Sequence, residues 1–210
     1  MVKNIAYIII IVIVSYAFSG CEDLIIGRNE ISDMAFPGVV AVDKSESGDG
    51  VILTVAPKKV QTSGGGGGGG ESEDEKTTEE QPMRGEGNTV FEANRMITAK
   101  AHKDIHWGHN EYIIVGEEAA KDDILKYLDF FIRNHETRFH INILVAKNST
   151  GKELIEKLQK SPVSITESIT NIYRNRGPLS YFSEMLLSEL SYCLSSRYTS
   201  AIIPAINISK

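Results

Sequence analysis

The first two dozen residues constrain this chain most, because they decide in which compartment everything after them folds. Lys3 gives a short positive start, and Ile5–Val14 is an unbroken apolar run. A helix needs about 20 apolar residues to span a bilayer, and this run falls well short of that length. A charged start, a short apolar run and an exit of small residues are typical of an export signal. We therefore expect residues 1–20 to form a signal peptide.

The end of this stretch indicates a lipid anchor. Ser19 and Gly20 are small, Cys21 follows them, and Glu22 begins a charged segment, which is the pattern of a bacterial lipobox. In that motif the thiol is joined to a diacylglycerol, and the chain is then cut in front of the cysteine. Two acyl chains hold a protein on a membrane at about 0.8 kcal/mol for each buried CH₂ group. We predict that Cys21 becomes an S-diacylglycerol cysteine, with N-acylation as a further modification.

Phe18 departs from this pattern, since lipoboxes usually carry leucine or another aliphatic residue at that position. The alternative interpretation is an uncleaved N-terminal anchor in which the cysteine has no special role. The spacing, the small residues and the abrupt switch to charged residues together favour the lipoprotein.

Charge and cysteine content narrow the class of protein. The 210 residues carry a net charge of −6, and removal of residues 1–20 takes away Lys3 and no acid, which leaves −7. An acidic chain of this kind argues against nucleic acid as a partner. The length that remains suits a single domain. Cys193 has no disulfide partner once Cys21 is lipidated, and its apolar helical context predicts a buried free thiol.

The first part of the mature chain predicts a hairpin followed by an insertion. Two apolar runs, Val39–Val42 and Val51–Ala56, flank a turn cluster at Ser45–Gly50, which favours antiparallel strands, and Pro37 favours a strand start. Seven consecutive glycines and an acidic run then occupy residues 63–82. Glycine loses the most backbone entropy on ordering and like charges repel, so we expect a flexible insertion there.

Strands and helices alternate in the rest of the chain. A helix at Val90–Ala101 is expected after a cap at Asn88 or Thr89. Glu117 and Glu118 are expected to start another helix, whose core-facing stripe is Ile124, Leu125, Leu128, Phe131 and Ile132. The further predicted elements are strands Tyr112–Val115 and Phe139–Ala146, helices Thr150–Gln159, Ser164–Tyr173 and Leu179–Leu194, and a terminal strand within Ala201–Ile208.

This order predicts a mixed α/β (α+β) fold in which a central mixed β-sheet is flanked by helices. The early hairpin makes the sheet mixed, because the later strand–helix–strand units favour parallel pairing. We expect one domain over residues 21–210.

Two groups of residues resemble catalytic or binding motifs. His102, His106 and His109 lie close together and could bind zinc, but no carboxylate has a clear ligand spacing, so a surface or supporting role is favoured. Residues 146–153 nearly match a nucleotide-binding loop. Ala146 replaces the required glycine and Glu153 replaces the serine or threonine that would bind magnesium, so we reject this motif. The sequence also lacks a Gly-x-Ser-x-Gly elbow. We predict neither an enzyme nor a cofactor or metal site.

Several segments resemble the C-subunit lipoproteins of spore germinant receptors, the Ger(x)C family. A "G-H-x-x-x-x-I-x-G-E-x-x-A" pattern is a hallmark of that family, and it matches the stretch that begins at Gly108 and ends in Ala119-Ala120. An "E-I-x-D-x-A" stretch near the lipobox matches Glu30–Ala35. The segments that carry the resemblance, in the family's order, are 30–35, 85–93, 107–119, 128–134 and 143–147.

The resemblance implies a non-enzymatic subunit, lipid-anchored on the outer face of the inner spore membrane. It would assemble with an integral-membrane A subunit and a transporter-like B subunit in a complex that responds to nutrients. Lipidation of Cys21 is the one residue-level function that carries over. Family members usually continue into a second domain, which is absent after Lys210. We therefore expect either a truncated or split gene product or a protein reduced to the N-terminal domain.

Two other classes of protein compete with this interpretation. A lipid-anchored extracytoplasmic solute-binding protein would need two lobes around a polar cleft, and the chain is short for that. A surface hydrolase would need a nucleophile and a base, and the sequence shows no such pair.

Overall fold

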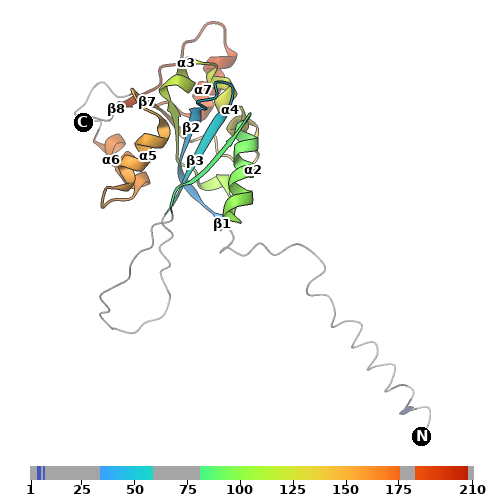
Figure 1. Ribbon diagram of the computed structural model, residues 1–210. Coiled ribbons are helices and arrows are strands. Elements are labelled where there is room, and N and C mark those ends of the chain that lie inside the picture. Colours follow the sequence, from blue (N-terminus) through green and yellow to red (C-terminus); the bar gives the residue numbers. More distant parts are fainter. Residues whose placement is uncertain (1–3, 6, 8–33, 59–80, 176–182, 208–210) are drawn as a thin grey trace. The chain divides into compact units, whose positions relative to one another are not determined.

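The computed structural model describes residues 4–5, 7, 34–58, 81–175 and 183–207 (Figure 1). Met34–Lys210 is a compact unit, separate from Met1–Asp33. Cys21, nearly all of the predicted signal peptide, and residues 63–80 of the predicted insertion lie outside the described residues. Gln81 and Pro82, the end of that insertion, belong to no helix or strand.

The main sheet of the described residues has the strand order β4-β3-β2-β6-β7-β8. Neighbours β4, β3 and β2 are antiparallel, whereas β2, β6, β7 and β8 are parallel to one another, so the predicted mixed sheet is confirmed. The strands are β2 Pro37–Lys44, β3 Val51–Pro57, β4 Met83–Gly87, β6 Tyr112–Gly116, β7 Asn142–Lys147 and β8 Ala205–Asn207. A separate parallel pair joins β1 (Met34–Ala35) to β5 (Asp104–Ile105).

The predicted hairpin is the first unit of this sheet. Val40 faces Val55 across the β2–β3 pair, and Pro37 is the first residue of β2, as expected. The turn closes where the Ser45 N–H donates to the Gly50 carbonyl at 2.8 Å, and Gly48 adopts a φ of 99°, which glycine accepts without strain. The predicted terminal strand is also confirmed, as β8.

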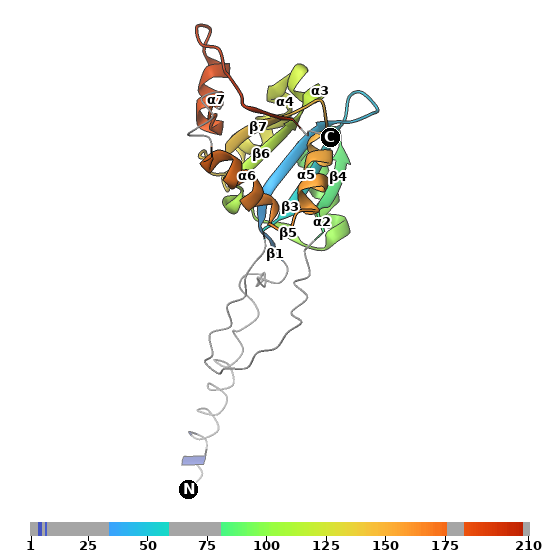
Figure 2. The ribbon, with the colours of Figure 1, turned by 90° about the vertical axis from the view of Figure 1, so that its left-hand side faces the viewer.

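Helices cover both faces of the sheet (Figures 1 and 2). The helices are α2 Val90–Ala101, α3 Glu117–Lys121, α4 Ile124–Arg133, α5 Gly151–Gln159, α6 Ile165–Arg174 and α7 Leu187–Ser195, with the 3₁₀-helix η2 at Trp107–His109. Helices α2, α4 and α7 pack on one face, and α5 and α6 pack on the other.

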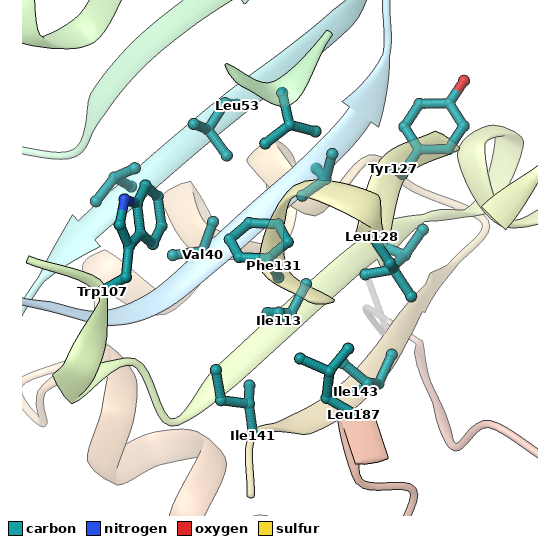
Figure 3. Packing of buried hydrophobic residues seen from close by; sticks show 14 of the residues in the cluster. Val40, Leu53, Trp107, Ile113, Tyr127, Leu128, Phe131, Ile141, Ile143 and Leu187 are labelled. Atoms are coloured by element: carbon teal, nitrogen blue, oxygen red, sulfur yellow. The ribbon is translucent and has the colours of Figure 1, made fainter. Parts of the chain in front are cut away.

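Alternation along the strands produces the two cores. In β2, Val40 and Val42 point into the larger core, while Val39 and Ala41 point into the smaller one. The larger core gathers Trp107, the aromatic residues of α4 and the aliphatic residues of β6 and β7 (Figure 3). Both faces of β2 and β6 are buried, which explains why these strands are almost continuously apolar.

Side-chain caps start the helices where the sequence predicted. Thr89 accepts a hydrogen bond from the Glu92 N–H at 3.2 Å, which selects Thr89 over Asn88 as the cap of α2. Thr150 and Glu153 form a reciprocal capping box at α5, and Ser164 caps α6. Each cap satisfies N–H groups that lack a partner within the helix.

The helix expected after Gly116 is wrong in two respects. It is interrupted at Asp122 and Asp123, because Asp123 caps a new helix by accepting from the Leu125 N–H at 3.1 Å. This cap rotates Leu125 outward, where 41% of the side chain is exposed. Tyr127 takes the core position instead and is fully buried.

Three further expectations need correction. Strand β7 begins at Asn142 and not at Phe139, which lies in a turn with 50% of its side chain exposed. The helix predicted from Leu179 begins at Leu187 in the described residues, because Leu186 is extended and bridges to Asn142. Residues 183–185 belong to no helix or strand, and residues 179–182 lie outside the described part. Cys193 is half-buried and not buried, since it lies beside the helix face that packs through Leu190.

Strand β4 was not predicted. Its sequence, Met83-Arg84-Gly85-Glu86-Gly87, contains no β-branched residue. Helix α2 crosses directly over it, and a Cβ atom at Gly85 would overlap the Ala93 carbonyl oxygen. The strand therefore depends on its glycines and on a helix that follows it in the chain.

Candidate functional site

The connection between β7 and α5 is where the sequence comes closest to a phosphate-binding loop. The N-terminus of a helix offers free N–H groups and a positive dipole end to an anion. Here those groups already have an acceptor, because the Gly151 N–H donates to Asp43 Oδ1 at 2.6 Å and the Lys152 N–H donates to Oδ2 at 2.9 Å. Asp43 at the end of β2 thus occupies the anion position of α5.

The Asp43 carboxylate is tightly enclosed by its neighbours. The residue is 2% exposed, and a Cβ atom at Gly116 would overlap its Oδ1. Burial raises the pKa of the Asp43 carboxyl, while the two backbone N–H donors and the charge of Arg84 act in the opposite direction. The carboxylate thus joins the ends of β2 and β6 to the start of α5.

This geometry adds a physical reason to reject nucleotide binding at residues 146–153. A phosphate group at α5 would have to displace a buried carboxylate of the same charge, and Glu153 lies in the same first turn. The point where a doubly wound sheet usually binds its ligand, beyond the carboxyl ends of neighbouring parallel strands, is closed here by an internal side chain.

A second polar group at this end of the sheet links β2 to the α3–α4 break. Lys44 Nζ lies 3.0 Å from Asp122 Oδ2, which also accepts a hydrogen bond from the Tyr127 hydroxyl at 3.1 Å. Burial, together with the Asp122 carboxylate, raises the pKa of Tyr127 to about 12. Lys44 holds the pKa of Asp122 below its ordinary value. These contacts hold the end of β2 against the break between α3 and α4.

Trp107, in the segment that resembles a known family, serves the core. Its side chain is 2% exposed, and its ring meets those of Phe130 and Phe131 edge-on at centroid distances of 5.3 Å (Figure 3). The backbone N–H of Trp107 donates to Glu136 Oε2 at 3.3 Å. The tryptophan therefore fixes η2 against α4 and against the loop that leads into β7.

The structure separates the three histidines considered for zinc. His102 ends α2 in a left-handed conformation with a φ of 51°. The rings of His106 and His109 lie 5.7 Å apart, and both meet Phe36 edge-on. Glu136 Oε2 is 3.7 Å from His106 Nδ1. In the described part of the chain, no three histidine, cysteine, aspartate or glutamate side chains are placed to hold a metal ion.

Asp43 is the residue that sequence reasoning missed. The available signal was a lone acid directly after the apolar run Val39–Val42, at the end of a strand expected to be buried. Cys21, the predicted lipidation site, lies outside the described residues. The described helices include none with the length and apolar character that crossing a bilayer requires.

Comparison with known proteins gives one family and one relative. A family model described as "Spore germination protein N-terminal domain" matches residues 27–208. The chain is 27% identical over 213 aligned positions to a Bacillus subtilis (strain 168) protein named as spore germination protein YfkR. That alignment covers 100% of this chain and 52% of the relative, so the chain spans about half of the relative's length. No solved structure matches.

Proposed function

Because this chain belongs to the spore germination protein N-terminal domain family, we propose that it is a lipid-anchored, non-enzymatic subunit of a spore nutrient germinant receptor. The observation that carries the proposal is the family match, which extends over residues 27–208 and thus over nearly all of the predicted mature chain. The relative named for spore germination supports the same role.

The proposed anchor is the diacylglycerol on Cys21. It would place the domain on the outer face of the inner spore membrane, beside integral-membrane A and B subunits. The predicted signal peptide and lipobox support this placement, and the acidic charge of the chain is consistent with a protein partner rather than nucleic acid. The domain would then be needed for assembly of the receptor or for its signalling.

Two structural observations support a role without catalysis. The helix N-terminus that could bind an anionic substrate is filled by Asp43. A solute-binding protein would use two lobes around a cleft, whereas the described residues build one main sheet with helices on both faces. Both observations favour a scaffold that presents surfaces to partners.

Deletion of the gene tests the proposed role. Spores that lack the protein should lose germination on one class of nutrient, and a plasmid copy should restore it. A non-nutrient trigger that releases core solutes directly should still germinate the mutant spores. This result would distinguish loss of the receptor from a general spore defect. Normal germination on every nutrient, in a strain that also lacks any paralogue, would contradict the proposal.

Replacement of Cys21 tests the anchor. In cells fed a labelled fatty acid, the wild-type chain should carry label and sediment with membranes. The Cys21→Ala chain should carry none, whereas the control Cys193→Ala should be labelled like the wild type. Labelling that survives Cys21→Ala would show that the lipid is attached elsewhere.

A further inference from the structure

The turn between β2 and β3 contains the one Asp-Gly dipeptide of the sequence, Asp49-Gly50. An Asp-Gly dipeptide can rearrange without an enzyme, because the main-chain nitrogen of the glycine can attack the side-chain carboxyl of the aspartate. The attack closes a five-membered succinimide ring. A side chain on the second residue would crowd the attack, and glycine has none. In a folded protein, the contacts around the dipeptide decide whether this reaction proceeds.

The carboxyl group of Asp49 has the freedom that ring closure requires. The residue is exposed, and the turn projects as a blue loop beyond the ends of β2 and β3 (Figure 2). Among the described residues, none donates a hydrogen bond to the Asp49 carboxylate or forms an ion pair with it. The side chain can therefore rotate toward the nitrogen of Gly50 without breaking an existing contact.

The attacking nitrogen is equally unhindered. The turn closes through the Ser45 N–H, which donates to the Gly50 carbonyl, while the Ser45 carbonyl accepts from the Gly48 N–H at 3.0 Å. Within the described part of the chain, no group accepts a hydrogen bond from the Gly50 N–H. The nitrogen can thus lose its proton and attack without breaking a hydrogen bond of the turn.

A lysine from a distant helix contacts the reacting peptide group. Lys126 Nζ in α4 donates to the Asp49 carbonyl oxygen at 2.7 Å, across 77 positions of sequence. The ammonium also lies 5.8 Å from the centroid of the Tyr127 ring, and this contact with a fully buried residue helps to hold it in place. The carbonyl that Lys126 contacts belongs to the same peptide group as the Gly50 nitrogen. A cation on that oxygen withdraws electrons and makes the N–H more acidic, which favours the nitrogen anion that attacks.

We propose that Asp49-Gly50 is a self-modification site, at which Lys126 promotes the conversion of Asp49 to isoaspartate. In the first step, the Gly50 nitrogen bonds to Asp49 Cγ, and its proton leaves as water together with the hydroxyl of the carboxyl group. In the second step, water adds to the main-chain carbonyl carbon of Asp49, and the bond from this carbon to the Gly50 nitrogen breaks. One water leaves and one enters, so the conversion needs no other reactant and does not depend on the proposed receptor role.

The same lysine directs the second step. Water that attacks the side-chain carbonyl of the succinimide restores aspartate, whereas attack at the main-chain carbonyl gives isoaspartate. Lys126 contacts the main-chain carbonyl oxygen, so it stabilises the negative charge that develops there and favours isoaspartate. In the product, the main chain runs through the former side chain, and the released carboxylate meets the Lys126 ammonium. The turn gains one main-chain atom between Ser45 and Gly50, the residues whose hydrogen bond closes it.

Peptide mapping of the full chain in detergent tests the conversion. The protein is held at neutral pH, and samples are digested at intervals with a protease that cleaves before aspartate but not before isoaspartate. Mass spectrometry locates the uncleaved site, and an isoaspartyl methyltransferase with a labelled methyl donor measures the amount of product. Isoaspartate should accumulate at position 49. Asp49→Glu should give none, because a six-membered ring closes far more slowly.

Substitutions of Lys126 test its part in the reaction. Lys126→Met should slow the conversion several-fold, whereas Lys126→Arg keeps a cationic donor and should retain most of the rate. Lys121→Met is the matched control, because Lys121 pairs with Glu117 and Glu118 in α3, and it should leave the rate unchanged. In urea the contact between α4 and the turn is lost, so the wild type and Lys126→Met should then react at the same rate.

Several results would overturn the proposal. Absence of isoaspartate at position 49 would show that the fold protects the dipeptide, and so would a faster conversion in urea than in the folded protein. Equal rates in the folded wild type and in Lys126→Met, with circular dichroism showing that both are folded, would exclude the lysine. A difference between these two proteins that persists in urea would trace the effect to something other than the contact at Asp49.

Discussion

Replacing Asp43 with asparagine isolates the carboxylate that fills the start of α5. Asparagine has nearly the same shape but offers one acceptor where aspartate offers two. One of the two N–H groups, Gly151 at 2.6 Å or Lys152 at 2.9 Å, then keeps its bond, and the other faces an NH₂ group. A buried donor left without a partner costs about 1–3 kcal/mol.

The cost should depend on pH, because burial raises the pKa of Asp43 above its ordinary value of 3.8. A raised pKa in the folded state means that the folded protein binds the proton more tightly than the unfolded chain does. The corresponding stability is therefore complete below the unfolded pKa and is lost as pH rises through the folded pKa. Asparagine does not titrate. The wild-type advantage of about 1–3 kcal/mol from the second acceptor therefore applies at neutral pH, where Asp43 is ionised. It should increase as pH falls through the folded pKa, because the folded state binds the proton more tightly.

Urea unfolding of the full chain in detergent, followed by circular dichroism from about pH 3.5 to pH 7.5, measures this difference. For a unit of this size, each kcal/mol corresponds to about 2–4 °C in Tm. Asp49→Asn is the matched control, because Asp49 is exposed in the β2–β3 turn, and it should change stability by less than about 0.5 kcal/mol. Hydrogen exchange of the first amides of α5 should accelerate in Asp43→Asn alone.

Two results would refute this reasoning. If Asp43→Asn is as stable as the wild type at neutral pH, where the carboxylate is ionised, the two N–H bonds do not hold α5 as described. If the wild-type advantage grows as pH rises, the folded state lowers the pKa of Asp43. The N–H donors would then stabilise the carboxylate by more than burial destabilises it.

Two substitutions in the larger core complete the predictions. Trp107→Ala should lower the free energy of unfolding by about 3–5 kcal/mol, because the side chain is 2% exposed and packs on two phenylalanines. Phe91→Ala, at a ring that is 56% exposed, should cost much less, and equal costs in urea titrations would contradict this account of the core. Gly85→Ala should destabilise by about 1–3 kcal/mol, since its Cβ would overlap the Ala93 carbonyl and push α2 off β4; an unchanged Tm would show that the two elements can separate without cost.

The elements that could be predicted from the sequence are those fixed by short-range chemistry. Thr89, Thr150 and Ser164 cap helices by accepting from N–H groups three residues ahead, so the necessary residues sit side by side in the sequence. The β2–β3 hairpin likewise needs only two apolar runs and the turn between them. The family resemblance rested on such local segments, and the match over residues 27–208 confirms it.

The features that were missed depend on distant partners. Asp43 bonds to N–H groups 108 and 109 residues away, so its position after an apolar run does not reveal which groups it binds. Strand β4 forms because α2 fits over Gly85, and the start of α7 is set by the bridge between Leu186 and Asn142. The helical periodicity of the sequence also assigned Leu125 to the core. Periodicity cannot detect that Asp123 caps a new helix, in which different residues face the core.

The β3–β4 pairing has a consequence for how this chain can vary. Strand β3 ends at Pro57, and the adjacent strand β4 begins at Met83. The register of the β3–β4 pair is nevertheless kept along its whole length, from Val55 opposite Met83 to Val51 opposite Gly87. The entropy lost in closing a connection grows only with the logarithm of its length, at about 0.6 kcal/mol for each doubling. A glycine tract such as Gly64–Gly70 can therefore expand or contract by replication slippage at almost no thermodynamic cost. The same site could accept an epitope tag while the strands on either side keep their alignment.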